Sequence, residues 1–200
     1  MLSKPILTDI NLVIQPGKQY LVLGPPGSGK TTLLKMIAGL LPVNKHQSLE
    51  GIITYNGRSL FDQMDGICIA NAFGYVDQLD QHAALLTVGE TLDFAFQCKG
   101  GGQFIRERDE MTPEQIKVLE DADRDHLALK TTLCILGLQE VKDTFVGDTN
   151  VRGVSGGQRR RVTVGEMIMS RVPVLCGDEI STGLDAASTY DMIEMLLHIG

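Results

Sequence analysis

A glycine-rich segment near the start of the chain has residue types that could hold a chain of phosphates. It has the pattern Gly-x4-Gly-Lys-Thr, and we expect its binding residues to be Gly24, Pro25, Pro26, Gly27, Ser28, Gly29, Lys30, Thr31 and Thr32. An apolar run of strand length precedes it and apolar residues at helical spacing follow it, which predicts strand, loop and helix. Glycines allow backbone N–H groups to crowd around phosphate oxygens, and the helix N-terminus adds partial positive charge.

The alternative for this segment is a Gly/Pro turn beside a surface lysine. Its position between a predicted strand and a predicted helix favours the phosphate interpretation. Lys30 would then reach the β and γ phosphates, and the Thr31 hydroxyl would bind Mg²⁺. By itself the segment predicts a nucleoside-triphosphate site and nothing more specific.

Two adjacent acids follow an apolar run late in the chain. Residues 172–177 predict a buried strand that delivers Asp178 and Glu179 at its carboxyl end, where open α/β sheets place ligand chemistry. We expect Asp178 to bind Mg²⁺, directly or through water, and Glu179 to orient the attacking water and accept its proton. Two acids after an apolar run are also typical of a solvated turn, but a phosphate loop upstream favours the catalytic interpretation.

A third string, Ser155-Gly156-Gly157-Gln158, opens a helix that we expect to run to about Met169. The Ser-x-x-Gln spacing is also a capping box, so an ordinary helix start is an alternative. Two glycines directly after the cap cost the helix about 1 kcal/mol each and leave the bare backbone that an approaching anion needs. We favour a second phosphate site, which predicts two copies of the domain closing over each other's nucleotides.

Together these strings resemble the nucleotide-binding domain of an ABC transporter, and the resemblance covers nearly the whole chain. Walker A corresponds to residues 24–31, the signature to 154–158, Walker B to 172–178, the D-loop to 183–185 and the Q-loop glutamine to Gln78. Longer stretches resemble the G subfamily, of the pleiotropic-drug-resistance type, and specifically the first nucleotide-binding domain of its full-length members. These stretches are 76–82, 143–148, 152–167 and 178–185.

The resemblance implies an α/β fold of the P-loop NTPase (RecA-like) type, with a mainly parallel sheet, a small antiparallel β layer and a helical subdomain. It also implies a head-to-tail dimer over ATP and Mg²⁺, in which Gln78 would contact the Mg²⁺ or the attacking water near the transmembrane domain. The implied catalytic residues are Glu179, Gln78 and Lys30, and the implied metal ligands are Thr31, Gln78 and Asp178. Across the dimer, the other domain would present Ser155, Gly156, Gly157 and Gln158.

Two residues depart from the family pattern without removing a charged group. Gly177 stands where the strand usually keeps an apolar residue, and Ile180 stands where many ABC proteins have proline or another residue type. We expect Gly177 to loosen the strand beside the metal ligand Asp178.

Composition limits the classes of function. The 200 residues, 43% of them hydrophobic, are enough for one domain, and the formal net charge of −7 disfavours a nucleic-acid surface. The only basic run, residues 159–161, is expected to be a solvated or locally salt-bridged helix surface. No stretch approaches the roughly 20 apolar residues of a spanning helix, so a membrane role would require a partner segment.

The expected elements divide the chain into three parts. Residues 1–86 form the β layer and the Walker A core, with strands at 6–14, 20–23 and 51–55 and a turn at Asn56-Gly57. Residues 87–148 form the helical subdomain, in which a helix from the Thr87 capping box ends near Gln97 at Gly100–Gly102. A second helix starts at Pro113 and runs to about Leu136. Residues 149–200 hold the signature helix, Walker B, the D-loop and a helix from Asp185 through Ile199.

The sequence therefore predicts an ATP-hydrolysing domain of a membrane exporter, membrane-associated at the cytoplasmic face. Its expected partners are a second nucleotide-binding domain and a transmembrane domain, with no nucleic acid. A soluble ABC ATPase acting on nucleic acid or ribosomes is the alternative, although residues 79–153 hold neither a coiled coil nor a basic arm. A non-hydrolysing regulatory half is the third. We expect the core to be truncated at its C-terminal end, and the chain alone to hydrolyse ATP weakly or not at all.

Overall fold

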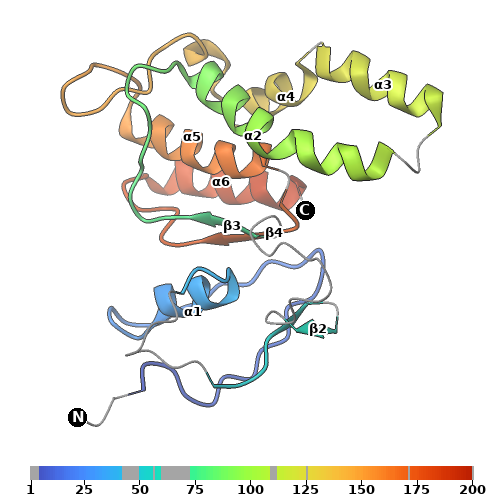
Figure 1. Cartoon of the computed structure of the whole chain (residues 1–200). Coiled ribbons are helices and arrows are strands. Elements are labelled where there is room, and N and C mark those ends of the chain that lie inside the picture. The colour runs from blue at the N-terminus through green and yellow to red at the C-terminus, as the bar shows by residue number, and fades with distance from the viewer. Residues whose placement is uncertain are drawn as a thin grey trace.

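A two-stranded parallel sheet lies at the centre of the computed structural model, which describes residues 5–41, 50–55, 57–59, 73–108, 112–124, 126–170 and 172–199. Strand β3 (Phe73–Val76) pairs with β4 (Val174–Gly177), in the register Phe73↔Val174 to Val76↔Gly177. Helix α1 (Lys30–Ile37) lies on one side of this sheet and α5 (Gly156–Met169) on the other (Figure 1). The predicted parallel core is therefore present as a small sheet between helices.

Alternation along the two strands explains this layering, because successive side chains of a strand point to opposite faces. Phe73 and Cys176 face α1 and pack with its Leu34 and Ile37. Val76 joins the larger buried cluster on the opposite face. The sheet thus joins the helix that follows the phosphate loop to the helix that follows the signature string.

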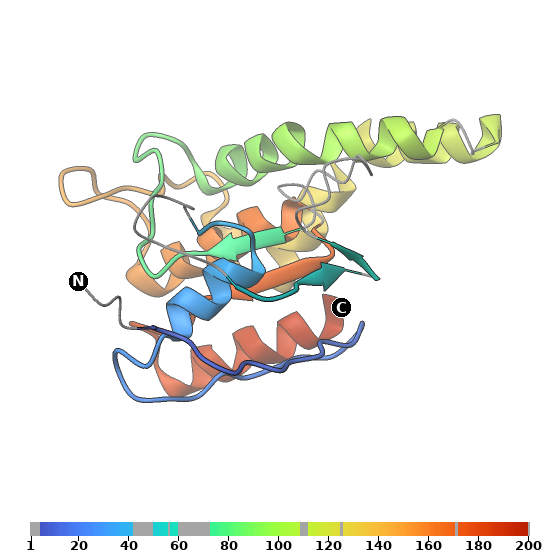
Figure 2. The same ribbon diagram turned by 60° about the horizontal axis from the view of Figure 1, so that its bottom comes forward.

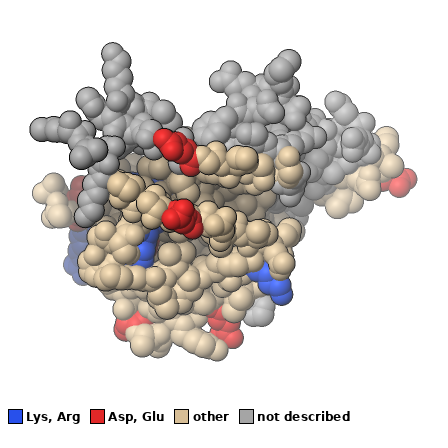
Figure 3. Space-filling model, turned by 90° about the horizontal axis from the view of Figure 1, so that it is seen from below, with Lys and Arg blue, Asp and Glu red and all other residues tan. Residues whose placement is uncertain are grey.

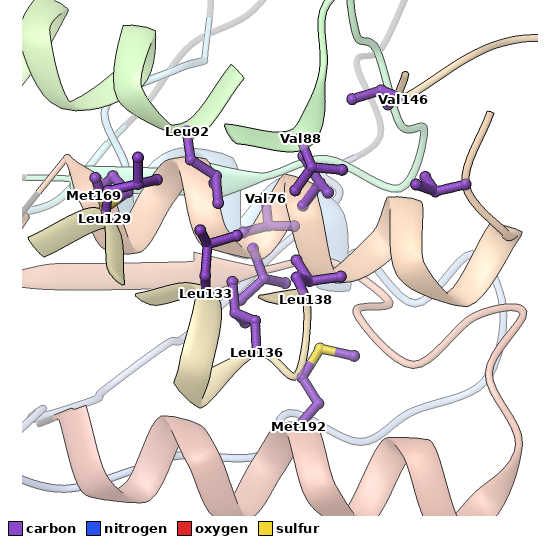
Figure 4. Packing of buried hydrophobic residues seen from close by; sticks show 13 residues of the cluster. Val76, Val88, Leu92, Leu129, Leu133, Leu136, Leu138, Val146, Met169 and Met192 are labelled. Carbon is purple, nitrogen blue, oxygen red and sulfur yellow. The ribbon is translucent and has the colours of Figure 1, made fainter. Parts of the chain in front are cut away.

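The largest core lies among the helices on the α5 side. It is built from α2 (Val88–Arg108), α4 (Leu127–Ile135), α5 and the single-turn helix η3 (Gln139–Val141), and includes the fully buried Leu92 (Figure 4). Gly165 of α5 lets α2 and α4 approach, because a Cβ there would lie 2.7 Å from both Leu92 Cδ2 and Leu136 Cδ1. The signature helix is therefore fixed on the apolar side chains of the helical subdomain.

Helix α2 begins as predicted and ends later than predicted. The Thr87 N–H donates to Glu90 Oε2 over 2.8 Å, and the Glu90 N–H donates to Thr87 Oγ1 over 3.2 Å, which completes the capping box. The helix then continues through Gly100–Gly102 to Arg108, so the predicted break is wrong. Glycine costs a helix only about 1 kcal/mol and keeps its N–H, so it does not force an end.

The next helical stretch starts where the sequence predicts and is divided in two. Helix α3 (Pro113–Arg124) has the proline at its first position, and α4 begins after His126, whose φ of 49° is left-handed. One continuous helix to Leu136 is therefore wrong, because a left-handed residue interrupts the helical hydrogen-bond pattern. Helix α2 runs outward and α3 returns, so the pair extends beyond the sheet (Figures 1 and 2).

The N-terminal segment differs most from expectation. Residues 6–14 and 20–23 form no strand, and Leu21 and Leu23 are 83% and 81% exposed. A strand is stable only when another strand accepts its hydrogen bonds, and no described strand pairs with this segment. The described surface on this side carries few charged side chains (Figure 3). The apolar residues of this segment therefore form no strand, and side chains such as Leu21 and Leu23 are exposed to solvent.

The predicted hairpin forms beside α1. Strand β1 (Thr54–Tyr55) pairs antiparallel with β2 (Arg58–Ser59), with Gly57 at a φ of 79° in the turn, while Asn56 lies outside the described residues. The Tyr55 hydroxyl donates to the Ile37 carbonyl at the end of α1, and burial raises the pKa of Tyr55 to about 12. Among the described residues the antiparallel layer is thus this hairpin, without the N-terminal strands expected beside it.

The last helix, α6 (Ala186–Ile199), begins as predicted after Asp185, whose Oδ2 accepts from the Ser188 N–H over 3.2 Å. Across the described ranges, no helix is both long enough and apolar enough to pass through a bilayer.

Candidate nucleotide-binding and hydrolysis site

The predicted phosphate loop is a compact turn held by its own backbone. The Lys30 Nζ donates to the carbonyls of Gly24 and Pro25 over 2.9 and 3.0 Å, and the Ser28 N–H donates to the Pro25 carbonyl over 3.2 Å. Helix α1 starts directly at Lys30, and its N-cap residue Gly29 supplies no side-chain cap. The first N–H groups of this helix therefore remain available to an anion, as helix N-termini commonly are.

Two glycines of the loop have conformations that explain their identity. Gly27 and Gly29 have φ values of 76° and 91°, in the left-handed region that glycine adopts without strain. A Cβ on Gly29 would also lie 2.8 Å from Leu7 Cδ2, whereas a Cβ on Gly27 would meet nothing within 4 Å. The loop thus needs Gly29 for both shape and packing, and Gly27 for shape alone.

The two acids lie where β4 ends, as predicted. The Asp178 N–H donates to the Val76 carbonyl over 3.0 Å, which extends the parallel ladder by one residue. Asp178 is only 4% exposed, and its Oδ2 accepts from the Tyr75 hydroxyl over 3.0 Å. Burial first, and then this hydrogen bond, raise the pKa of Tyr75 above its usual range. Tyr75 therefore stays protonated and fixes one oxygen of the carboxylate.

Glu179 is exposed and has an uncommon backbone conformation. Its φ of 50° is left-handed, which costs a non-glycine residue on the order of 1–3 kcal/mol and persists only where the surroundings enforce it. Its Oε2 accepts from Gln78 Nε2 over 2.6 Å and from Thr182 Oγ1 over 3.2 Å. The predicted catalytic acid and the predicted Q-loop glutamine are therefore in direct contact.

The structure thus brings Gln78, Asp178 and Glu179 together where two neighbouring parallel strands end. Lys30 and Thr31 belong to the helix packed on the same sheet, but no hydrogen bond or ion pair among the described residues joins them to these three. The phosphate loop and the acid group, which consists of Gln78, Asp178 and Glu179, are therefore two separate clusters on one sheet.

The predicted signature cap is a complete capping box. The Gln158 N–H donates to Ser155 Oγ over 3.2 Å, and the Ser155 N–H donates to Gln158 Oε1 over 2.9 Å. A Cβ on Gly157 would lie 3.1 Å from Leu184 Cδ2, but a Cβ on Gly156 would meet nothing within 4 Å. Helix capping accounts for Ser155 and Gln158, and packing for Gly157, whereas no contact among the described residues requires glycine at 156.

Sequence reasoning missed the role of Arg160. This arginine is 2% exposed, so the expected solvated or locally salt-bridged surface is wrong for it: its ion pair, with Nη1 2.9 Å from Asp80 Oδ1, joins residues 80 positions apart. Its remaining donors reach backbone carbonyls of the segments that carry Gln78, Asp178 and Glu179. Arg160 is followed by buried Thr163 and Val164, and this spacing of three and four could have identified the buried face.

The departures at Gly177 and Ile180 complement each other. A Cβ on Gly177 would lie 2.5 Å from Ile180 Cγ2, so the isoleucine occupies the space that a larger residue at 177 would need. Gly177 keeps its full backbone pairing with Val76. The expected loosening of the strand beside Asp178 is therefore wrong, because Ile180 covers the glycine.

The oxygen ligands at this site suit Mg²⁺ in type. Mg²⁺ commonly takes one or two carboxylates together with waters and substrate phosphates. Asp178 supplies a buried carboxylate, and Thr31 and Gln78 carry a hydroxyl and an amide oxygen. Within the described residues, no group of three or more His, Cys, Asp or Glu side chains could hold a metal. Asp178 and Gln78 of one cluster and Thr31 of the other therefore offer oxygen ligands of the type that Mg²⁺ accepts beside phosphate.

A separate cavity of about 470 Å³ lies between the end of α4 and α6. Its lining residues are Cys134, Ile135, Leu136, Gly137, Arg161, Asp191, Met192 and Glu194. None of the predicted site residues contributes to it, so it is distinct from the phosphate loop and the acid group.

Comparison with known proteins identifies the family of this chain. The model of the ABC transporter family matches residues 7–182. The chain therefore belongs to the ABC transporter family. Membership implies the P-loop NTPase fold and an ABC-type ATPase domain, and domains of this family bind ATP, generally with Mg²⁺.

Similar proteins of known name place the chain within one branch of that family. ABC transporter G family member 36 of Arabidopsis thaliana is 42% identical over 209 residues, covering 97% of this chain and 14% of the relative. ABC transporter G family member 35 of Oryza sativa subsp. japonica is 40% identical, with the same coverage. Pleiotropic drug resistance protein 1 of Petunia hybrida is 39% identical over 207 residues, with coverages of 96% and 14%. The chain thus resembles G-family domains and spans 14% of the length of each relative.

Proposed function

We propose that this domain binds Mg-ATP on the phosphate loop and hydrolyses it to drive export through a transmembrane domain, at the cytoplasmic face of a membrane. The observation that carries the proposal is the 2.6 Å hydrogen bond between Gln78 and Glu179 beside the buried Asp178. A glutamine that orients water, an acid that accepts its proton and a metal-binding carboxylate are what ATP hydrolysis requires.

Each residue would have a distinct role in hydrolysis. Lys30 would exchange its two loop carbonyls for the β and γ phosphate oxygens, and Thr31 and Asp178 would hold Mg²⁺. The bound ion would neutralise charge on the phosphates. Gln78 would position the attacking water, and Glu179 would take its proton as the new bond to the γ phosphorus forms. The bond from that phosphorus to the bridging oxygen would break, and ADP would leave. Release of Glu179 from Gln78 would free the carboxylate for this role.

A head-to-tail pair of domains is the second part of the proposal. Gly156 stands at the first position of α5 with open space around it, and a glycine there costs the helix about 1 kcal/mol. Because no contact in the described part of the chain requires glycine here, a group that approaches from outside would explain its use. A phosphate of the nucleotide on a second domain suits this position, since backbone N–H groups at a helix N-terminus bind anions.

The membrane role follows from the names of the relatives. They are called ABC transporters of the G family and a pleiotropic drug resistance protein. Coupling to a transmembrane domain, in the same or a partner chain, is proposed on this basis. The net charge of −7 gives no support to the soluble alternative that acts on nucleic acid.

The test uses two variants of the purified full-length protein. Glu179→Gln should keep Mg-ATP affinity, lower the steady-state rate by about 10²–10⁴-fold and trap a closed pair, because only the proton acceptor is lost. Lys30→Ala should weaken nucleotide binding itself, because the charge-assisted contact to phosphate is lost. Fluorescent-nucleotide titration, phosphate release and the mass of the ATP-bound complex measure these effects. Wild-type turnover in Glu179→Gln would remove the acid from its role.

A further inference from the structure

We propose that Arg160 is a positioning residue for hydrolysis, which holds the two main-chain segments that carry Gln78, Asp178 and Glu179. The proposal rests on the proposed function, since it assigns a support to the residues that would perform the reaction. Arg160 belongs to α5, the helix that starts at the signature cap. It therefore connects that cap to the acid group of the same domain.

The arginine uses all of its hydrogen-bond donors on this task. A guanidinium has five N–H groups in a fixed planar fork. Nη1 donates to the Asp77 carbonyl over 2.7 Å and to Asp80 Oδ1 over 2.9 Å. The other donors reach three successive carbonyls, over 3.0 Å from Nη2 to Asp178, 3.1 Å from Nη2 to Glu179 and 3.2 Å from Nε to Ile180.

These acceptors belong to the two segments whose relative position matters for the reaction. The Asp77 carbonyl directly precedes Gln78, and the Glu179 carbonyl belongs to the residue with the left-handed φ of 50°. That backbone conformation persists only where its surroundings enforce it. The Arg160 guanidinium bonds to both segments and therefore sets the distance between Gln78 and Glu179.

The charge of the buried arginine is balanced within the same cluster. Asp80 Oδ1 accepts from Arg160 and also from Thr163 Oγ1, over 2.6 Å, and Thr163 lies on the next turn of α5. The His82 Nε2 lies 2.9 Å from Thr163 Oγ1 and so adds to the same network. Because a buried charge without a partner is strongly unfavourable, this pairing fixes Arg160 in one place.

The position of Arg160 on α5 connects the segments that it holds to the proposed second phosphate site at the Ser155 cap. Arg160 follows Ser155 by about 7.5 Å along the axis of α5, at a rise of 1.5 Å per residue. A helix transmits a displacement as a rigid element. When a partner's nucleotide moves the Ser155 cap, the arginine moves with it and shifts the carbonyls around Glu179.

The test compares three variants of the full-length protein. Arg160→Met keeps an unbranched stem and removes all five donors, so kcat should fall about 10- to 100-fold, while the affinity for Mg-bound fluorescent ATP stays within about twofold. Arg160→Lys should retain more activity than Arg160→Met, because an ammonium keeps the charge but cannot span both segments. Equal rates for Arg160→Met and the wild type would overturn the proposal.

Arg161→Met is the matched control on the same helix. Arg161 makes contacts of 3.4 Å to the Leu136 carbonyl and Ser188 Oγ, away from the acid group. Its kcat should stay within about twofold of the wild type, and its thermal midpoint reports general destabilisation. If Arg161→Met loses as much activity as Arg160→Met, or if nucleotide affinity falls in parallel with kcat, Arg160 only supports the fold.

A measurement without nucleotide tests the same geometry. Amide hydrogen exchange at residues 77–80 and 178–180 should accelerate in Arg160→Met and not in Arg161→Met, because the carbonyls that hold these segments lose their donor. Unchanged exchange would contradict the proposal. Failure of the proposed function is separate, since it would show as full turnover in Glu179→Gln, whatever Arg160→Met does.

Discussion

Residues 5–59 and residues 73–199 differ in how their apolar side chains are used. In the later region Leu92, Leu138 and Val162 are fully buried in one cluster of helices. In the earlier region Leu21 and Leu23 are among the most exposed side chains, and of its described elements α1 and the hairpin pack on the sheet. Helices form from local contacts and then pack, whereas a strand forms only when a distant segment accepts its hydrogen bonds.

The same difference divides the candidate site. Lys30 is held by carbonyls five and six residues away, so the phosphate loop is set by its own sequence. Glu179 bonds Gln78 across 101 residues, and Asp178 bonds Tyr75 across 103. The half of the site that we propose for phosphate binding is therefore local, and the half that we propose for hydrolysis depends on contacts between distant parts of the chain.

The largest expected effect tests the contrast between the two regions directly. Leu92→Ala should lower the free energy of unfolding of this chain by about 2–5 kcal/mol, because it leaves a cavity in the closed helical core. Leu21→Ala is the matched control and should change it by less than about 0.5 kcal/mol, since its side chain is already in solvent. Urea unfolding followed by circular dichroism measures both. A large loss in Leu21→Ala would mean that residues 20–23 pack as the strand that the sequence predicts.

A smaller effect is expected where the Ile180 side chain covers Gly177 beside the two acids. Gly177→Ala should destabilise the chain by about 1–3 kcal/mol, because its Cβ would lie 2.5 Å from Ile180 Cγ2. Adding Ile180→Ala should recover part of this loss by removing the obstructing methyl group. Gly27→Ala is the comparison variant, because its loss of stability would come from the φ of 76° and not from a clash with a neighbouring atom. Additive losses in the Gly177→Ala, Ile180→Ala double variant, from the same urea titrations, would contradict the packing explanation.

What the sequence predicts well is local. The boxes at Thr87–Glu90 and Ser155–Gln158 and the helix start at Asp185 are spacings of three, and each occurs where expected. The phosphate loop is likewise recognisable from a short string. The break at Gly100–Gly102 was wrong because propensity is a weak determinant beside the continuity of a formed helix.

What the sequence misses is the contact between distant residues. The string Arg159–Arg161 gives no sign that its middle member bonds Asp77, which lies 83 residues earlier. The resemblance implies that Gln78 and Glu179 act in the same reaction, but it predicts neither the contact of Tyr75 with Asp178 nor that of Ile180 with Gly177. The Arg160 and Tyr75 contacts arise only once β3, β4 and α5 are assembled, because each joins residues from different elements. The contact of Ile180 with Gly177 is local, but it depends on how the backbone turns after β4.

The smallest expected effect concerns the acidic cap that begins the packed region. The hydrogen bonds from the Thr87 backbone and side chain lower the pKa of Glu90 below its ordinary value of 4.5. A lowered pKa in the folded state means that the unfolded chain binds the proton more readily. The stabilisation by ionised Glu90 is therefore complete above the ordinary pKa and is lost as the pH falls through the folded-state pKa. Glu90→Gln should therefore have a lower urea midpoint than the wild type at pH 7, and the gap should close in acid. If the difference in urea midpoint widened as the pH fell, the protonated form of Glu90 would be the stabilising one. The charged capping box would then not be the reason that α2 starts at Val88.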